Sequence, residues 1–146
     1  MSFGVDANLL VYASVETSPF HERASAFLRR CAEGPEIACL PWPVVMAFLR
    51  LVTHPRIVSE PLTPEAAMAN VDALLSLPHV RAIGEDDGFW KAYRSATTGL
   101  AVRGNLVADA HVAALLRQHG VRVLYSNDAD YRRFAFLDVR NPLEGD

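Results

Sequence analysis

The stretch Phe3-Gly4-Val5-Asp6 sets the first expectation for the fold, because a short apolar run ends there in a carboxylate. Runs of this kind are typical of strands buried inside a sheet. Similar runs predict strands at 37–40, 80–83 and 121–125, and a weaker one predicts a strand at 137–139. The first stretch is therefore interpreted as the first strand of a buried sheet.

Longer apolar periods separate these runs and predict helices between the strands. Ser18-Pro19 and Thr63-Pro64 each place a capping residue before a proline, which is a favoured first helical residue. Other helices are predicted at 44–52, 89–97 and 107–119. Because the connections are too long for hairpins, the sequence predicts an α/β fold whose central sheet is mostly parallel and covered on both faces.

Composition limits the kind of protein that this chain can be. Its 146 residues, 51% of them hydrophobic, suffice for one domain with a buried core. No apolar stretch is long enough to span a bilayer and the N-terminus does not resemble a signal peptide, so we expect a cytoplasmic protein without membrane contact. With a net charge of −3, any contact with nucleic acid must be local.

Three aspartates are predicted to meet at one edge of the sheet. Asp6 ends the first strand, Asp128 follows the strand at 121–125, and Asp109 lies in the first turn of the helix at 107–119. In a doubly wound sheet the first and fourth strands are central neighbours, and ligands bind at the carboxyl ends of the strands. The three charges would repel one another there unless a cation neutralised them.

Each aspartate alone also has a purely structural explanation. Asp6 and Asp128 could cap the turns that follow them, and Asp109 could complement a helix dipole. Neither the two cysteines nor the five histidines show metal-ligand spacing, so the three carboxylates together favour an oxygen-preferring ion such as Mg²⁺ or Mn²⁺. Phosphodiester hydrolysis is the chemistry that suits such a site.

Several segments resemble the motifs of PIN domains, in the order in which that family shows them. They are Val5-Asp6-Ala7-Asn8-Leu9-Leu10, Gly104-Asn105-Leu106-Val107-Ala108-Asp109-Ala110-His111 and Ser126-Asn127-Asp128-Ala129-Asp130-Tyr131. Between the first two, the segment 41–56, with Pro41-Trp42-Pro43 and Phe48-Leu49-Arg50, resembles a branch of the bacterial VapC toxins. The resemblance covers essentially the whole chain.

What the resemblance implies is a single PIN domain over 1–146, with a three-layer α/β/α fold and the activity of a Mg²⁺- or Mn²⁺-dependent endoribonuclease. It also implies a homodimer, and a VapB antitoxin whose C-terminal segment occupies the active-site groove. The metal ligands that it implies, the first three of them catalytic, are Asp6, Asp109, Asp128 and Asp130. The residues that it implies for positioning RNA or water are Asn8, Arg50, Ser126 and Asn127. Turns, caps or a solvated helix end explain this second set as well.

One position departs from the family that the chain resembles. Members of this branch carry a glutamate immediately before Phe48-Leu49-Arg50, where this chain has Ala47. Taken alone, Ala47 is an ordinary small helix residue. Beside the matching motifs it predicts a catalytic position without its carboxylate, either in a naturally weakened enzyme or in a deliberately inactivated variant of an active one.

Other functions remain open at this point. A DNA nuclease would use the same acidic chemistry, although the chain is too short for the added helices with which flap-type enzymes thread DNA. A receiver-type phosphoacceptor domain needs a lysine after a late strand, and the only lysine is Lys91. A catalytically silent PIN-like module that binds antitoxin or RNA is the alternative that Ala47 favours.

Overall fold

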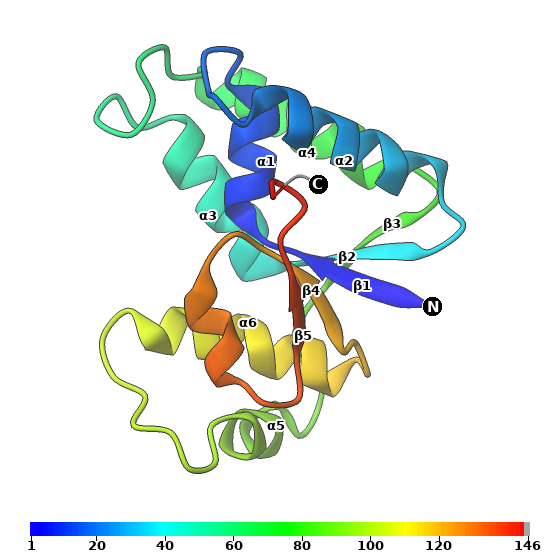
Figure 1. Ribbon diagram of the computed structural model, residues 1–146, viewed down its shortest axis with the longest axis vertical. Coiled ribbons are helices and arrows are strands. Elements are labelled where there is room, and N and C mark those ends of the chain that lie inside the picture. The colour runs from blue at the N-terminus through cyan, green and yellow to red at the C-terminus, as the bar shows by residue number, and fades with distance from the viewer. Residues whose placement is uncertain (145–146) are drawn as a thin grey trace.

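The computed structural model describes residues 1–144, and the last two residues of the predicted domain, 145–146, lie outside the described part. Five parallel strands form one sheet in the order β3-β2-β1-β4-β5 (Figure 1). In chain order the strands are β1 (Ser2–Val5), β2 (Ile37–Pro41), β3 (Val80–Ile83), β4 (Val123–Tyr125) and β5 (Asp138–Arg140). The prediction that the first and fourth strands are central neighbours is confirmed.

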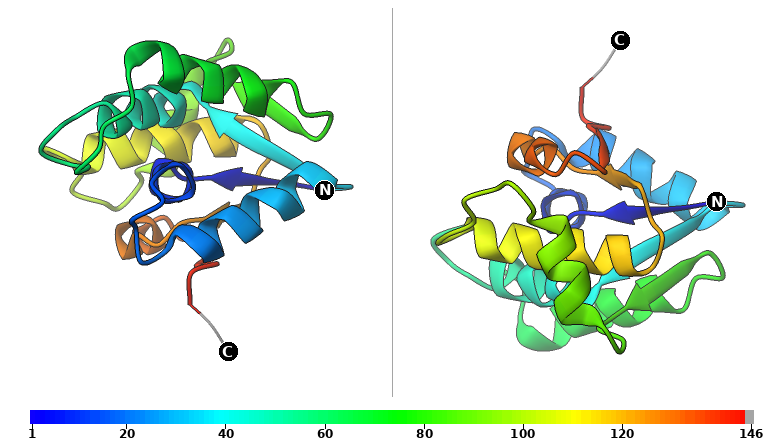
Figure 2. Two further views of the ribbon diagram at one scale, coloured as in Figure 1. Left: turned by 90° about the horizontal axis from the view of Figure 1, so that it is seen from above. Right: turned by 90° about the horizontal axis from the view of Figure 1, so that it is seen from below.

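Helices cover both faces of this sheet. They are α1 (Ala7–Ser14), α2 (His21–Glu33), α3 (Trp42–Val52), α4 (Pro64–Leu75), α5 (Phe89–Ala96), α6 (Leu106–Gln118) and the 3-10 helix η1 (Ala129–Arg133). In Figure 1, α1, α2 and α4 lie above the sheet and α5 and α6 below it, and Figure 2 shows the arrangement from two further sides. The three-layer α/β/α prediction is thus confirmed. Within 1–144 no helix has the length and apolar character needed to cross a membrane.

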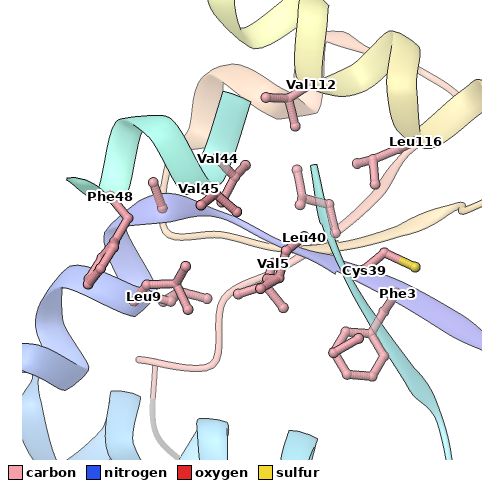
Figure 3. Packing of buried hydrophobic residues seen from close by; sticks show 14 of the residues in the cluster. Phe3, Val5, Leu9, Cys39, Leu40, Val44, Val45, Phe48, Val112 and Leu116 are labelled. Carbon is pink, nitrogen blue, oxygen red and sulfur yellow. The ribbon is translucent and has the colours of Figure 1, made fainter. Parts of the chain in front are cut away.

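Helix α6 packs directly on the central strand β1. A Cβ atom on Gly4 would lie 2.7 Å from Cδ2 of Leu116, so a glycine at this position allows α6 to approach the strand closely. Figure 3 shows Val112 and Leu116 of α6 on one side of β1, and Phe3 and Leu9 on the other. Because α6 begins near the carboxyl end of β1, this packing places its first turn beside the residue that ends the strand.

Two helix starts differ from the sequence prediction. Helix α2 begins at His21 rather than directly after Ser18-Pro19, and its N-cap Phe20 has no side-chain capping bond. The Ser18 hydroxyl instead accepts a hydrogen bond from the Phe20 amide at 3.1 Å, which forms a turn before the helix. Helix α1, directly after Asp6, was not predicted. The predicted start of α4 is confirmed, because Thr63 caps it and Pro64 is its first residue.

Candidate active site

Asp6 occupies the junction between β1 and α1, at the carboxyl end of the sheet. Its Oδ1 accepts a hydrogen bond from the Ala7 amide at 2.8 Å, and its Oδ2 accepts one from the Ser126 hydroxyl at 2.7 Å. The side chain is buried, and burial raises its pKa, while the two hydrogen bonds lower it and the charge of Asp128 raises it further. Asp6 is therefore both the cap of α1 and a carboxylate held in one orientation.

Ser126 connects the end of β4 to two of the predicted metal ligands. Its hydroxyl donates to Asp6 and accepts a hydrogen bond from the Asp128 amide at 2.9 Å. Asp128 in turn caps η1, where its Oδ1 accepts a hydrogen bond from the Asp130 amide at 2.9 Å. One buried serine thus ties the carboxylate after β1 to the carboxylate after β4.

Asp109 lies in the first turn of α6, as predicted. Burial raises its pKa to about 6, and the charges of Asp128, Asp6 and Asp130 raise it as well, while a hydrogen bond from Tyr131 opposes them. Burial and the same nearby carboxylates also raise the pKa of Tyr131, so its phenol stays protonated and acts as the donor. Sequence analysis did not single out Tyr131, and its one signal was its place directly after Asp130 in the last motif.

The carboxylates converge on one cavity. One oxygen each of Asp109, Asp128 and Asp130 lie within 4.8 Å of one another, close enough to share a cation. Asp6, Asp109 and Asp128 line a cavity of about 190 Å³, together with Tyr131 and residues of α1 and α3. The mutual repulsion of these carboxylates is the electrostatic condition under which a divalent ion binds favourably.

Helix α3 forms the opposite wall of this cavity, through Pro43, Val44, Ala47, Arg50 and Leu51. Ala47 is half-buried there, facing the space that the carboxylates surround. The position at which the resembled family has a glutamate is therefore within the site, although this chain offers no oxygen ligand there.

The predicted substrate-binding residues fall into two pairs. Asn8 and Arg50 line the cavity, and the Arg50 side chain is exposed. Ser126 and Asn127 do not line it, since Ser126 is buried behind Asp6 and the Asn127 amide donates to the Tyr12 hydroxyl at 3.2 Å. The geometry supports an RNA contact for the first pair and a supporting role for the second.

Comparison with known proteins places this geometry among nucleases. Residues 4–137 match the PIN domain family. Ribonuclease VapC48 of Mycobacterium tuberculosis is 43% identical over 145 residues, which are 99% of this chain and 100% of the relative. Ribonuclease VapC43 of the same species is 36% identical over 97% of this chain and 95% of its own length.

Solved structures show the same fold at lower sequence identity. VapBC2 from Rickettsia felis, bound to a DNA fragment from its promoter, is 19% identical with a TM-score of 0.70, over 97% of this chain and 98% of that one. VapC20 from M. tuberculosis, a toxin that cleaves the sarcin-ricin loop, is 21% identical with a TM-score of 0.67, over 94% and 98% of the two chains.

Proposed function

Because the chain belongs to the PIN domain family, and within it to the VapC ribonucleases, we propose that it is a toxin that hydrolyses RNA phosphodiester bonds with the help of a divalent metal ion. The observation that carries the proposal is the convergence of Asp6, Asp109 and Asp128 on one cavity at the carboxyl end of the sheet. We further propose that the whole chain, 1–146, acts as one PIN domain.

The donor set fits a hard cation. Asp6, Asp109, Asp128 and Asp130 supply carboxylate oxygens, and the site contains no histidine or cysteine among its described residues. We propose Mg²⁺ or Mn²⁺ as the ion, with these four aspartates as ligands, either direct or through water. When bound, such an ion activates a water molecule and stabilises the negative charge that develops on the phosphate.

The RNA contacts that we propose lie on the α3 side of the cavity. The Arg50 guanidinium can pair with two phosphate oxygens, and Asn8 offers an amide that can orient the sugar–phosphate backbone or a water molecule. Within 1–144, Arg50 takes part in no ion pair, so its charge is available to substrate. Such contacts read no base, so they place the scissile phosphate without setting the sequence that is cut.

A partner of the VapB type is proposed for the groove beside the cavity. This groove lies between α1 with its following loop and the end of α3 with its following loop, and it shares Asn8 and Leu51 with the cavity. Its other apolar side chains are Val11, Tyr12, Val15, Pro19, Ile57 and Val58. An antitoxin segment could fill this groove and place a basic side chain among the carboxylates. That antitoxin should then compete with Mn²⁺ for the site.

We also propose a homodimer, supported by an apolar strip on α3. Trp42 and Met46 lie one helical turn apart and are 43% and 53% exposed. A second copy of the chain would bury this strip. Light scattering of the purified protein, with Met46→Glu as the disrupting variant, tests this proposal, and a monomer at micromolar concentration would reject it.

The experiment that tests the nuclease function is incubation of the purified protein with bacterial total RNA, with Mn²⁺ or with a chelator. New 5′ ends mapped by sequencing should appear only with metal, and Asp128→Asn should abolish them. Equal cleavage by the unchanged protein and Asp128→Asn would identify a contaminating nuclease and remove the support for this proposal.

Ala47 is the specific observation that favours a second function, a silent PIN module that binds antitoxin or RNA without cutting it. The same incubation separates the two functions. A silent module would retain RNA in a filter-binding assay and yield no new ends at any Mn²⁺ concentration.

A further inference from the structure

Each of the three cavity carboxylates depends on its own hydrogen-bond donor. Asp6 is held by the Ser126 hydroxyl and the Ala7 amide, and Asp128 by the Asp130 amide. For Asp109, the hydroxyl of Tyr131 is the one side-chain donor among the residues that the structure describes. The orientation of the Asp109 carboxylate therefore rests on a residue outside the set of predicted ligands.

Tyr131 is placed to hold this orientation firmly. Its side chain is 3% exposed and its ring packs beside that of Phe134, with the ring centres 6.4 Å apart. The backbone around it is fixed at both ends of η1, because Asp128 caps the start and the Phe134 amide donates to the Tyr131 carbonyl at 3.1 Å. The phenol hydroxyl consequently reaches the cavity from a rigid support.

A carboxylate with one oxygen occupied by a donor favours a particular way of binding metal. Asp128 uses Oδ1 to cap η1, and Asp109 accepts the bond from Tyr131, so each presents mainly its other oxygen to the cavity. Single-oxygen coordination suits the small octahedral shell of Mg²⁺ and Mn²⁺. The larger Ca²⁺ often binds both oxygens of a carboxylate and tolerates irregular geometry.

We propose that Tyr131 is a positioning residue whose hydroxyl keeps Asp109 in single-oxygen presentation, and that it thereby makes the site prefer Mn²⁺ and Mg²⁺ over Ca²⁺. This inference rests on the proposed function, because it concerns the same metal site. It assigns to Tyr131 no contact with RNA and no part in proton transfer.

The test is metal binding by Tyr131→Phe, which keeps the packed ring and removes the hydroxyl alone. Calorimetric titration without RNA should show Mn²⁺ affinity about tenfold lower, the lower end of the range for groups that orient a ligand. Ca²⁺ affinity should fall much less, so the Mn²⁺/Ca²⁺ preference should narrow. In the RNA cleavage assay at fixed Mn²⁺, kcat should fall while KM stays the same.

Two controls separate positioning from general stability. Tyr93→Phe removes a hydroxyl from α5, where the ring stacks on Trp90 away from the carboxylates, and it should leave both metal affinities unchanged. In an Asp109→Asn background, Tyr131→Phe should have no further effect on Mn²⁺ affinity, because the group that it orients no longer carries the charge. This second comparison still decides the matter if the single variant is unstable.

An unchanged Mn²⁺/Ca²⁺ preference in folded Tyr131→Phe would overturn the inference, and the proposed nuclease would stand if cleavage still required Asp128. Conversely, weakened Mn²⁺ binding in Tyr131→Phe, with no RNA cleavage by any variant, would support the inference and reject the nuclease. Absence of Mn²⁺ binding by the unchanged protein at millimolar metal would overturn it outright.

Discussion

The two walls of the cavity differ in how far each is equipped for chemistry. The carboxylate wall, made of Asp6, Asp109 and Asp128, gathers negative charge, and hydrogen bonds hold each of its members in place. The α3 wall, from Pro43 to Leu51, is mainly apolar and contributes one exposed cation, Arg50. The carboxylate wall retains everything that the family motifs predict, whereas the α3 wall lacks the acid expected at Ala47. The difference shows that metal affinity and catalytic rate can be altered separately in this fold.

The largest effect should come from giving the α3 wall its carboxylate with Ala47→Glu. An added ligand fixes the ion and helps to lower the pKa of its bound water, so RNA cleavage should rise by roughly a hundredfold. Without metal the variant should be less stable, because each carboxylate whose pKa rises by one in the more crowded cluster costs about 1.4 kcal/mol at neutral pH. Cleavage rates of both proteins at equal Mn²⁺ provide the measurement. Asp6→Asn combined with Ala47→Glu controls for contamination, and equal rates for folded Ala47→Glu and the unchanged chain would exclude position 47 from the site.

A smaller effect is expected from loosening the carboxylate wall with Ser126→Ala. The change removes the hydroxyl that donates to Asp6 and accepts from the Asp128 amide, at a residue that is 1% exposed. Loss of a buried hydrogen bond to a charged group should lower the free energy of unfolding by about 2 kcal/mol. Urea denaturation measures this, with Ser76→Ala on the surface as the matched control because its hydroxyl bonds only to the Ala73 carbonyl. Similar losses in both variants would mean that Ser126 does not hold the site together.

Charge removal at Asp109 should act in the opposite direction. Its pKa is raised from 3.8 to about 6, so the folded protein holds a proton that the unfolded chain has released between these values. Stability linked to this group is therefore present below pH 4, falls as the pH rises, and is fully lost above pH 6. Asp109→Asn should raise metal-free stability at pH 7 by about 1 kcal/mol, after allowing for solvent screening, and should change nothing at pH 3.5. Thermal unfolding at both pH values measures this, and an equal gain at both would show that repulsion is not the cause.

The smallest effect should come from the one cation of the α3 wall. Arg50→Ala removes a phosphate partner and leaves the metal ligands in place, so KM for RNA should rise about fivefold while kcat changes little. Steady-state kinetics on a short RNA provides the measurement, and Arg29→Ala, an exposed arginine on α2, is the control. If Arg29→Ala raised KM equally, only the overall charge of the protein would matter.

The sequence predicted the carboxylate wall better than the α3 wall, for physical reasons. Asp6 and Asp128 follow apolar runs, and the rule that parallel strands end at one edge of a sheet was sufficient to bring them together. The same rule could not identify Tyr131, since its adjacency to Asp130 does not show that its hydroxyl turns toward α6. Nor could it show that Ser126 is consumed by two hydrogen bonds, because these depend on the pairing of β1 with β4.

The missed helix α1 has a related explanation. Ala7–Ser14 is short, and its consecutive apolar residues Leu9, Leu10 and Val11 are all buried, so no alternation of polar and apolar faces is visible there. Only Asp6, as an N-cap, marked its start, and that residue was already claimed by the metal site. The structure shows that the two roles coexist, because capping engages Oδ1 and the carboxylate still lines the cavity.

The hydrogen bond between Ser126 and Asp6 joins residues that are 120 positions apart in the chain. Contacts of such long range form late in folding, and the residues after β4 are also among the last to be synthesised. A growing chain that has been made only as far as α5 carries Asp6 but has neither Asp109 nor Asp128 to place beside it. Translation must therefore pass β4 before the carboxylates can assemble, so a nascent chain shorter than this poses no threat to the RNA of the ribosome that is making it.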